Sequence, residues 1–314
     1  MERRIYKNAV EGVTPSRKRL YAASRFFWDV GLPAIEKEFP AYVDRAAAGC
    51  FAASSDCGQL IGFQIYLTQD DYDNIGSSVQ LLLDSLPKDY DNMHFEQVGR
   101  VFSIDSFYLD MTAGRFKSAP VLAGDWLSIP EYRLFDLAQG QVFYDPIGDF
   151  TERRKGFMAY YPEDAWRFKL CRSLYEFGYC GQVMLPDALS EADYFTAELA
   201  WWRFAGAAMR LGFHLVREYS PDERRLYREF SRLAEFSPSV VNLLWNGQCD
   251  VGSRPMIVEE MASVYKGIIV KLGLLSCSMI ENAGSFVDLA RGIAEGISDC
   301  YIRDAAVRLE GDFV

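Results

Sequence analysis

Histidine is almost absent from this 314-residue sequence, which contains only His94 and His214. Two such residues are too few for a metal site built from several histidines, and they leave little room for Ser-His or Cys-His catalysis. The phosphate-binding loops G-x-x-x-x-G-K-S/T and G-x-G-x-x-G are also missing, as is the G-x-S-x-G turn of serine hydrolases. The sequence therefore excludes the common nucleotide-binding loops and the common hydrolase nucleophile.

Paired cysteines, long apolar runs and a positive net charge are missing too. None of the seven cysteines stands at C-x-x-C spacing, so we expect reduced, mostly buried thiols in a cytoplasmic protein. No stretch approaches the roughly 18 apolar residues of a membrane span, and residues 1–19 lack the apolar run of a signal peptide. The net charge of -11 disfavours nucleic acid and anionic membranes as partners, and it leaves a nucleotide, a small molecule or a protein.

The first half of the chain mixes helical and strand patterns. Apolar spacing predicts a helix over 15–38 and a second one that ends at Pro87. Short apolar or alternating runs predict strands over 49–53, 62–67, 100–108 and 141–145.

Beyond about residue 150 the pattern is almost purely helical. Steps of four and three from Phe195 to Val216 predict a long helix with this stripe facing the core, and 256–275 and 286–301 repeat the pattern. The predicted fold class is α+β, with a small mixed sheet and helices over residues 1–150, followed by an all-α helical bundle over residues 151–314.

A basic face is predicted on the long helix. Its members are spaced seven, four and three residues apart: Arg203, Arg210, His214 and Arg217. Such a face could bind a phosphate or an RNA backbone. Alternatively it is a solvated face paired with nearby acids, namely Glu218, Asp222, Glu223 and Glu229.

An acidic cluster, Asp70-Asp71-Tyr72-Asp73, has two interpretations as well. Neighbouring carboxylates can share a metal ion. Here they precede a helical stripe, where carboxylates stabilise the unpaired amides of a helix start, and we favour this second interpretation.

Several segments, taken in order, resemble a bacterial family of predicted nucleotidyltransferases that is itself a domain-of-unknown-function family. The resemblance covers about residues 15–235. Its segments include Ser24–Trp28, Ser55-Asp56-Cys57, Leu67–Tyr72, Trp126–Glu131, Val142–Thr151, Tyr160–Asp164 and Gly181-Gln182. Val142–Thr151 is the most specific of them.

This resemblance implies an amino-terminal half with the kanamycin-nucleotidyltransferase (polymerase-beta-like) fold and a HEPN-like helical second half. In that fold a small-residue turn cradles the triphosphate, and an acidic pair further on binds Mg²⁺, which stabilises the charge of the transferring group. The resemblance places Ser54 and Ser55 in the nucleotide-binding turn, with Asp145 and Gln182 as further nucleotide-binding candidates. Asp145 could equally be a turn or helix-start acid.

The sequence departs from the family where the acidic pair should stand. Ser54-Ser55-Asp56-Cys57 runs directly into an apolar segment, and about a dozen residues, including the pair, are missing. Asp56 and Asp105 are the remaining candidates for catalytic carboxylates, and Asp105 could instead be a strand-end turn residue. The sequence assigns no metal ligands.

Three functional hypotheses follow. The first is a degenerate nucleotidyltransferase-like protein, or pseudoenzyme, that binds a nucleotide or partner without transfer. The second is an active transferase that modifies a small molecule or protein; only this hypothesis requires Mg²⁺ and ATP, and otherwise no cofactor is expected. The third is a toxin–antitoxin-type interaction protein or RNase, although Arg210 and His214 stand closer together than the HEPN nuclease motif requires.

Overall fold

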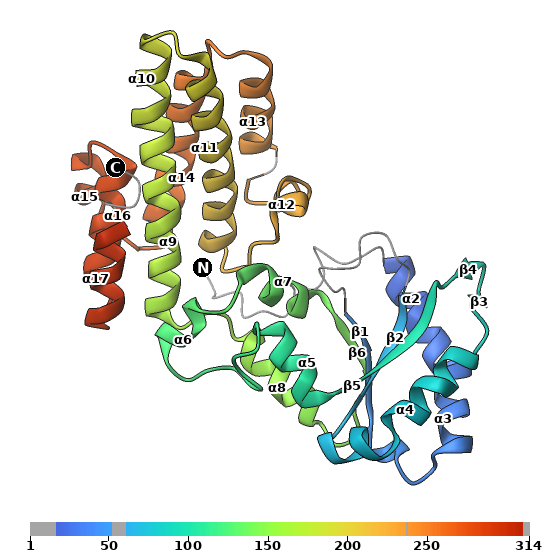
Figure 1. Ribbon diagram of the computed structural model, residues 1–314. Helices are drawn as coiled ribbons and strands as arrows, with labels where there is room; N and C mark the ends of the chain where they lie inside the picture. The colour runs from blue at the N-terminus through green and yellow to red at the C-terminus, as the bar shows by residue number, and fades with distance from the viewer. Residues whose placement is uncertain (1–16, 52–60, 237, 310–314) are drawn as a thin grey trace. The chain divides into compact units, whose positions relative to one another are not determined.

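The computed structural model describes residues 17–51, 61–236 and 238–309. Within them the chain forms two compact units (Figure 1). The sheet unit includes residues 128–160 and the described residues before 122, and the helical unit includes residues 122–127 and 161 onward. No described helix combines the length and apolar character needed to cross a membrane.

A four-stranded mixed sheet organises the first unit. Its order is β5-β2-β1-β6, and its strands are β1 (Ala47–Cys50), β2 (Ile61–Leu67), β5 (Gln97–Ser103) and β6 (Gln141–Tyr144). β1 pairs antiparallel with both β2 and β6, whereas β2 and β5 are parallel. The parallel pair needs a crossover, which the helix α4 (Gln69–Ser85) and a small hairpin provide. The hairpin strands are β3 (Asp89–Tyr90) and β4 (Met93–His94).

One face of the sheet carries the core of this unit. Alternation along β2 directs Phe63, Ile65 and Leu67 to this face, where they are at most 1% exposed. Helices cover the face (Figure 1): α2 (Arg17–Phe26), the π-helical turn η1 (Phe27–Gly31), α3 (Leu32–Glu38) and α4. The consecutive segments α2, η1 and α3 confirm the helix predicted over 15–38 within the described residues. At Gly31 a Cβ atom would lie 2.5 Å from the Phe63 ring, so glycine permits this close packing.

The opposite face of the sheet packs aromatic rings against three further helices. These are α5 (Ile104–Met111), α7 (Glu131–Gln139) and α8 (Asp149–Met158). The ring of Tyr66 on β2 stacks on Phe150 at 4.2 Å between centroids and meets Phe107 edge-on at 4.8 Å. Because Phe150 belongs to α8, this helix is part of the sheet unit.

The second unit is all helical, as the sequence predicts. The segments α9, η3 and α10 follow one another without a break, and α9 packs between α11 and α16. The segments are α6 (Ala123–Leu127), α9 (Glu163–Gly178), η3 (Tyr179–Met184), α10 (Leu185–Ser190), α11 (Tyr194–Leu215), α12 (Glu223–Phe230), α13 (Ser239–Cys249), α14 (Arg254–Lys271), α15 (Cys277–Asn282), α16 (Phe286–Glu295) and α17 (Cys300–Arg308). Together they confirm an α+β chain with a helical carboxyl-terminal region.

The predicted core stripe of α11 is wrong in its amino-terminal half. Phe195 and Trp202, two members of that stripe, are 84% and 54% exposed. The buried face instead contains Trp201, Phe204 and alanines, all close to 0% exposed. Small residues let neighbouring helices approach closely, and a pattern based on large apolar residues overlooks them.

Candidate functional site

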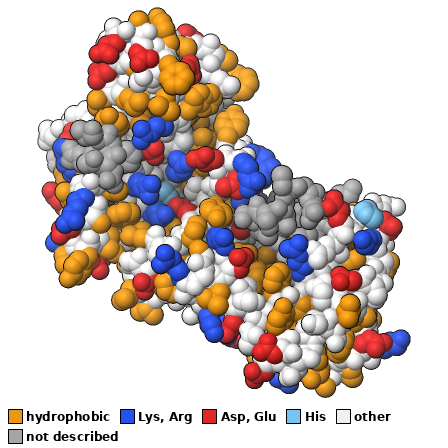
Figure 2. All heavy atoms as spheres, in the orientation of Figure 1, with side chains coloured by type: hydrophobic (Ala, Val, Ile, Leu, Met, Phe, Trp, Pro, Cys, Tyr) orange, Lys and Arg blue, Asp and Glu red, His pale blue; other side chains and the backbone are white. Residues whose placement is uncertain are grey.

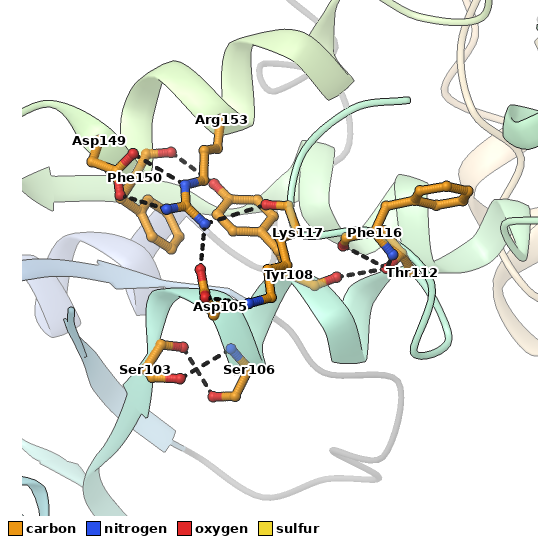
Figure 3. Close-up of polar contacts among 10 residues, drawn as sticks. All are labelled: Ser103, Asp105, Ser106, Tyr108, Thr112, Phe116, Lys117, Asp149, Phe150 and Arg153. Carbon is orange, nitrogen blue, oxygen red and sulfur yellow. Dashed lines mark hydrogen bonds and ion pairs between the residues drawn. The ribbon is translucent and has the colours of Figure 1, made fainter. Parts of the chain in front are cut away.

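Asp105 begins a helix rather than ending a strand. The strand predicted over 100–108 stops at Ser103, because the Ser103 hydroxyl accepts a hydrogen bond from the amide of Ser106 at 3.0 Å. This is a helix N-cap, and it turns the chain into α5. Asp105 therefore lies in the first turn of α5, next to the carboxyl end of β5 (Figure 3).

Two cations hold the Asp105 carboxylate. Arg153 Nη1 donates to Asp105 Oδ1 at 2.6 Å, and Lys117 Nζ donates to Asp105 Oδ2 at 2.7 Å (Figure 3). These hydrogen bonds, that of Lys117 first, lower the pKa of Asp105, although partial burial opposes the shift. Arg153 also binds Asp149 through two nitrogens, at 3.0 and 2.9 Å. Both oxygens of Asp105 thus take part in charge-assisted hydrogen bonds.

Asp145 caps the start of α8. Gly148 occupies the N-cap position with φ +84°, so no side chain is available there. Asp145 supplies the missing acceptor: it receives the amide of Gly148 at 3.0 Å, the amide of Thr151 at 2.8 Å and the hydroxyl of Thr151 at 2.6 Å. A helix start is a natural anion site, and here the protein's own carboxylate occupies it.

The structure thus brings Asp105 and Asp145 to the same short helix. Asp105 reaches α8 through Arg153, and Asp145 reaches it through Thr151. Tyr108 of α5 fixes the two helices together, because its hydroxyl donates to the carbonyl of Phe150 at 2.7 Å. We define the polar cluster as Asp105, Lys117, Asp145, Asp149 and Arg153. Its carboxylates are satisfied by cations and amides of the same unit.

Over residues 17–51, 61–236 and 238–309, no group of three or more His, Cys, Asp or Glu residues is placed to hold an ion. Asp71 and Asp70 of the other acidic segment lie in the first turn of α4, which Thr68 caps. Asp71 is 2% exposed and pairs with Arg45 at 2.8 Å. The segment thus lies at a helix start, as the favoured interpretation expects, but the hydroxyl of Thr68 and not a carboxylate accepts the amide there.

Ser54, Ser55 and Asp56 lie outside the described residues. The chain is described up to Phe51, and a buried side chain fixes it there. Gln64 of β2 accepts the amide of Phe51 at 2.8 Å and donates to its carbonyl at 3.0 Å. This pair gives the backbone of Phe51 the two partners of a strand residue.

A half-buried side chain that sequence reasoning missed is Arg154. Its guanidinium donates to three carbonyls at the end of α7, those of Leu137, Ala138 and Gly140, at 2.6–3.2 Å. The guanidinium also lies 5.4 Å from the centroid of Phe51. Burial lowers the pKa of Arg154. No spacing rule reveals such a residue, because its acceptors are main-chain atoms; the i,i+4 pair of Asp149 and Arg153, in contrast, can be found from sequence.

The basic face of the helical unit is paired with glutamates. Arg203 and Arg210 both approach Glu176, at 3.6 and 4.0 Å, and Arg210 also binds Glu223 at 3.1 Å. Glu223 belongs to the acids that the sequence suggested as partners, whereas Glu176 comes from α9. A phosphate would have to compete with these carboxylates.

Arg217 and His214 depart from the predicted face. α11 ends at Leu215, and Arg217 adopts a left-handed conformation with φ +57°, so it is not a helical residue. Its guanidinium lies 3.5 Å from the centroid of Trp166 and binds Glu163 at 2.7 Å. His214 is 3% exposed, and its Nδ1 lies 3.1 Å from the Ser173 hydroxyl.

Gln182 joins three segments of the helical unit. Its amide nitrogen donates to Glu259 of α14 at 3.1 Å, and its oxygen accepts the amide of Phe286 at the start of α16, at 2.9 Å. Both ends of the side chain are therefore used within the fold.

Comparison with known proteins adds one finding. The model of a family described as a domain of unknown function (DUF4037) matches residues 126–224, which include every element from α7 to α11. No curated protein and no solved structure matches the chain significantly. The matched stretch contains Asp145, Asp149 and Arg153 of the polar cluster, and it is similar to a family whose function is itself undefined.

Proposed function

We propose that this protein is a degenerate nucleotidyltransferase-like protein that binds a nucleotide or a protein partner without nucleotidyl transfer. The sequence resemblance supports the fold part of this proposal, and so does the arrangement of the sheet unit. Along the sequence, the strand β1 precedes the segment that contains Ser54 and Ser55, and β2 follows that segment.

The observation that carries the proposal is the pairing of the Asp105 carboxylate with two cations. A carboxylate that binds Mg²⁺ offers its negative charge to the ion. Here Arg153 and Lys117 already neutralise that charge, at 2.6 and 2.7 Å. Metal binding would require breaking both contacts and would place a divalent cation beside two positive charges. Asp105 therefore serves the fold in this proposal.

The rings beside β2 support the same proposal. The face of β2 that points toward α5 and α8 presents Gln64 and Tyr66, and the rings of Phe51, Phe107 and Phe150 pack against Tyr66. A transferase needs carboxylates that converge on a nucleotide. On this face, β2 presents the amide of Gln64 and the phenol of Tyr66 where a transferase would present carboxylates.

The other two hypotheses receive less support. An active transferase would depend on Asp56 and a rearranged acidic set. A ribonuclease would need a histidine that reaches its substrate, whereas His214 is buried and hydrogen-bonded to Ser173. Neither alternative is favoured by a contact in the described residues.

Calorimetric titration of ATP, once with Mg²⁺ and once with EDTA, tests the proposal. We expect either no binding or an affinity that Mg²⁺ does not change, because the charge of Asp105 is already neutralised by Arg153 and Lys117. Tight binding that requires Mg²⁺ would contradict the proposal and favour an active transferase.

A further inference from the structure

An apolar stripe on α11 faces solvent. Phe195, Leu199 and Trp202 are spaced four and three residues apart, which places them on one side of the helix. They are 84%, 49% and 54% exposed. Figure 2 shows hydrophobic side chains gathered over this end of the helical unit. We call these three residues the α11 stripe.

The same side of α11 is covered further along the helix. Phe213, eleven residues after Trp202, meets Phe230 of α12 at 6.3 Å between ring centroids. At Gly212 a Cβ atom would lie 2.5 Å from the Phe230 ring, so α12 packs closely there. Within the chain, the element that packs on this side of α11 is therefore α12, a short amphipathic helix that buries Leu226 and Phe230.

The charge of α12 is also informative. Its eight residues include three arginines, and Arg225 and Arg228 bind the acids Asp222 and Glu229 beside them. Arginine-rich flanks around an apolar face are thus compatible with packing on α11. A helix that extends this arrangement would lie over the α11 stripe.

Mostly acidic residues lie around the uncovered half. The charged residues of 185–202 are all acidic, namely Asp187, Glu191, Asp193 and Glu198, and the arginine that follows, Arg203, approaches Glu176 at 3.6 Å. Asp187, Glu191 and Asp193 are exposed, whereas Glu198 pairs with the buried Arg254 at 2.8 Å. An apolar stripe with an acidic border complements an apolar face that is flanked by lysine or arginine.

We propose that the α11 stripe docks an amphipathic helix of a partner protein, with Lys or Arg on both sides of its apolar face. The mode is helix-against-helix recognition, in which aromatic anchors supply contact area and the charged border sets orientation. The exposed stripe exceeds what scattered surface residues explain, because its members are large, apolar and contiguous. This inference does not rest on the proposed loss of nucleotidyl transfer.

The test uses the full chain and a synthetic amphipathic helix made of Leu and Lys, with fluorescence anisotropy of the labelled peptide as the measurement. A scrambled peptide of the same composition is the first control. The test variant is Phe195→Ser combined with Trp202→Ser, and Phe195→Ser alone is the second variant. The matched control is Tyr301→Ser. Tyr301 is also 84% exposed and is likewise the second residue of a helix capped by aspartate, α17.

We expect the helical peptide to bind the wild type and the Tyr301→Ser variant equally. The double variant should bind at least about tenfold more weakly, the single variant should fall between, and Glu191→Lys should also weaken binding. Circular dichroism should show every variant folded, because the changed side chains are exposed.

Three results would overturn the proposal. The scrambled peptide could bind as well as the helical one, which would indicate charge attraction alone. Tyr301→Ser could lose as much affinity as the double variant. Finally, the wild type could be a dimer that Phe195→Ser converts to a monomer, which would identify a second copy of this chain as the occupant of the stripe.

Discussion

Asp105 and Asp145 show how a short carboxylate beside a strand end can serve the fold. Asp105 accepts from Lys117 and Arg153, and Asp145 accepts from two amides and a hydroxyl. The partners of Asp105 were not apparent from sequence, because Lys117 and Arg153 are 12 and 48 residues away. Those of Asp145 are only three and six residues away, which agrees with the helix-start alternative that the sequence offered for this residue.

Replacing Asp105 with asparagine should destabilise the protein in a pH-dependent way. The pKa of Asp105 is depressed in the folded state, so its contribution is fully present above the unfolded value near 3.8 and is lost as pH falls through the lower folded value. At neutral pH we expect a loss of about 1.5–3 kcal/mol, the range for hydrogen bonds to a charged group. Urea denaturation of wild type and variant measures this difference.

The difference between the two proteins should shrink as the pH falls below 3.8, because the unfolded wild-type chain then binds a proton at Asp105 while the folded chain keeps this carboxylate ionised down to its lower pKa. Asp110→Asn is the matched control: Asp110 lies on the same helix, is 73% exposed and pairs with Arg133 at 3.2 Å. An exposed pair contributes little, so this variant should lose less than about 1 kcal/mol. A loss as large for Asp110→Asn as for Asp105→Asn would contradict the role given to the polar cluster.

The cysteines should divide by reactivity according to burial. Burial raises the pKa of the Cys171 thiol to about 12 and that of Cys180 to about 11, and both residues are 0% exposed. Cys249, Cys277 and Cys300 are exposed. Since the thiolate is the reactive form, iodoacetamide at pH 8 should label the exposed three in the native protein and label Cys171 and Cys180 only after denaturation.

Peptide mass spectrometry of the labelled protein measures this division. Native labelling of Cys171 at the rate of Cys249 would show that the core around α9 opens readily. Such a result would also show that the hydrogen bond from the Cys171 thiol to the carbonyl of Ala290, at 3.3 Å, does not keep the thiol from reacting.

At the scale of the element, α8 depends on a cap that comes from outside the helix. Asp145→Ala would leave the amide of Thr151 without its acceptor, next to an N-cap glycine that cannot replace it. We expect a loss of about 1–2 kcal/mol in the free energy of unfolding, as for other helix caps. Glu152→Ala is the control, because Glu152 is an exposed acid of the same helix whose partner, Lys155, is also exposed. That change should cost less than about 0.5 kcal/mol in a urea titration.

Element prediction succeeded where the apolar pattern was long and its capping residues were local. The helix before Pro87 was found from its stripe, and α4 ends at Ser85, two residues earlier. The strand over 100–108 was predicted too long because apolar residues continue through α5, while a single hydroxyl, that of Ser103, changes the backbone conformation. The helix over 286–301 is two helices, because Gly296 follows the end of α16 and Asp299 caps α17.

The phase of α11 was the main error, and its cause is physical. Large apolar residues occupy two sides of this helix, and sequence periodicity selects the side with more of them. Packing instead buried the side with Ala197, Ala200 and Ala208, where close approach to α9 is achieved. The side left in solvent is the α11 stripe. Here the mismatch between pattern and burial is itself a sign of an interaction surface.

At the scale of the whole molecule, each unit has its own buried core. The sheet unit is built around Phe63 and Ile65, and the helical unit is built around Trp201, Phe204 and Phe177. The fold class could be predicted because the first half alternates helix and strand patterns and the second half does not. The candidate site could be predicted only in part, because whether a carboxylate binds metal or an arginine depends on residues distant in sequence.

We propose that the carboxylates beside the sheet stabilise the fold and do not hold a metal ion. Calorimetric titration of ATP, with Mg²⁺ and with EDTA, into the wild type and into Asp105→Asn tests this proposal directly. We expect Mg²⁺ to leave any ATP affinity unchanged within about twofold in both proteins, while Asp105→Asn loses stability. A wild-type affinity at least about tenfold tighter with Mg²⁺, and lost in Asp105→Asn, would contradict the account and would identify Asp105 as a metal ligand.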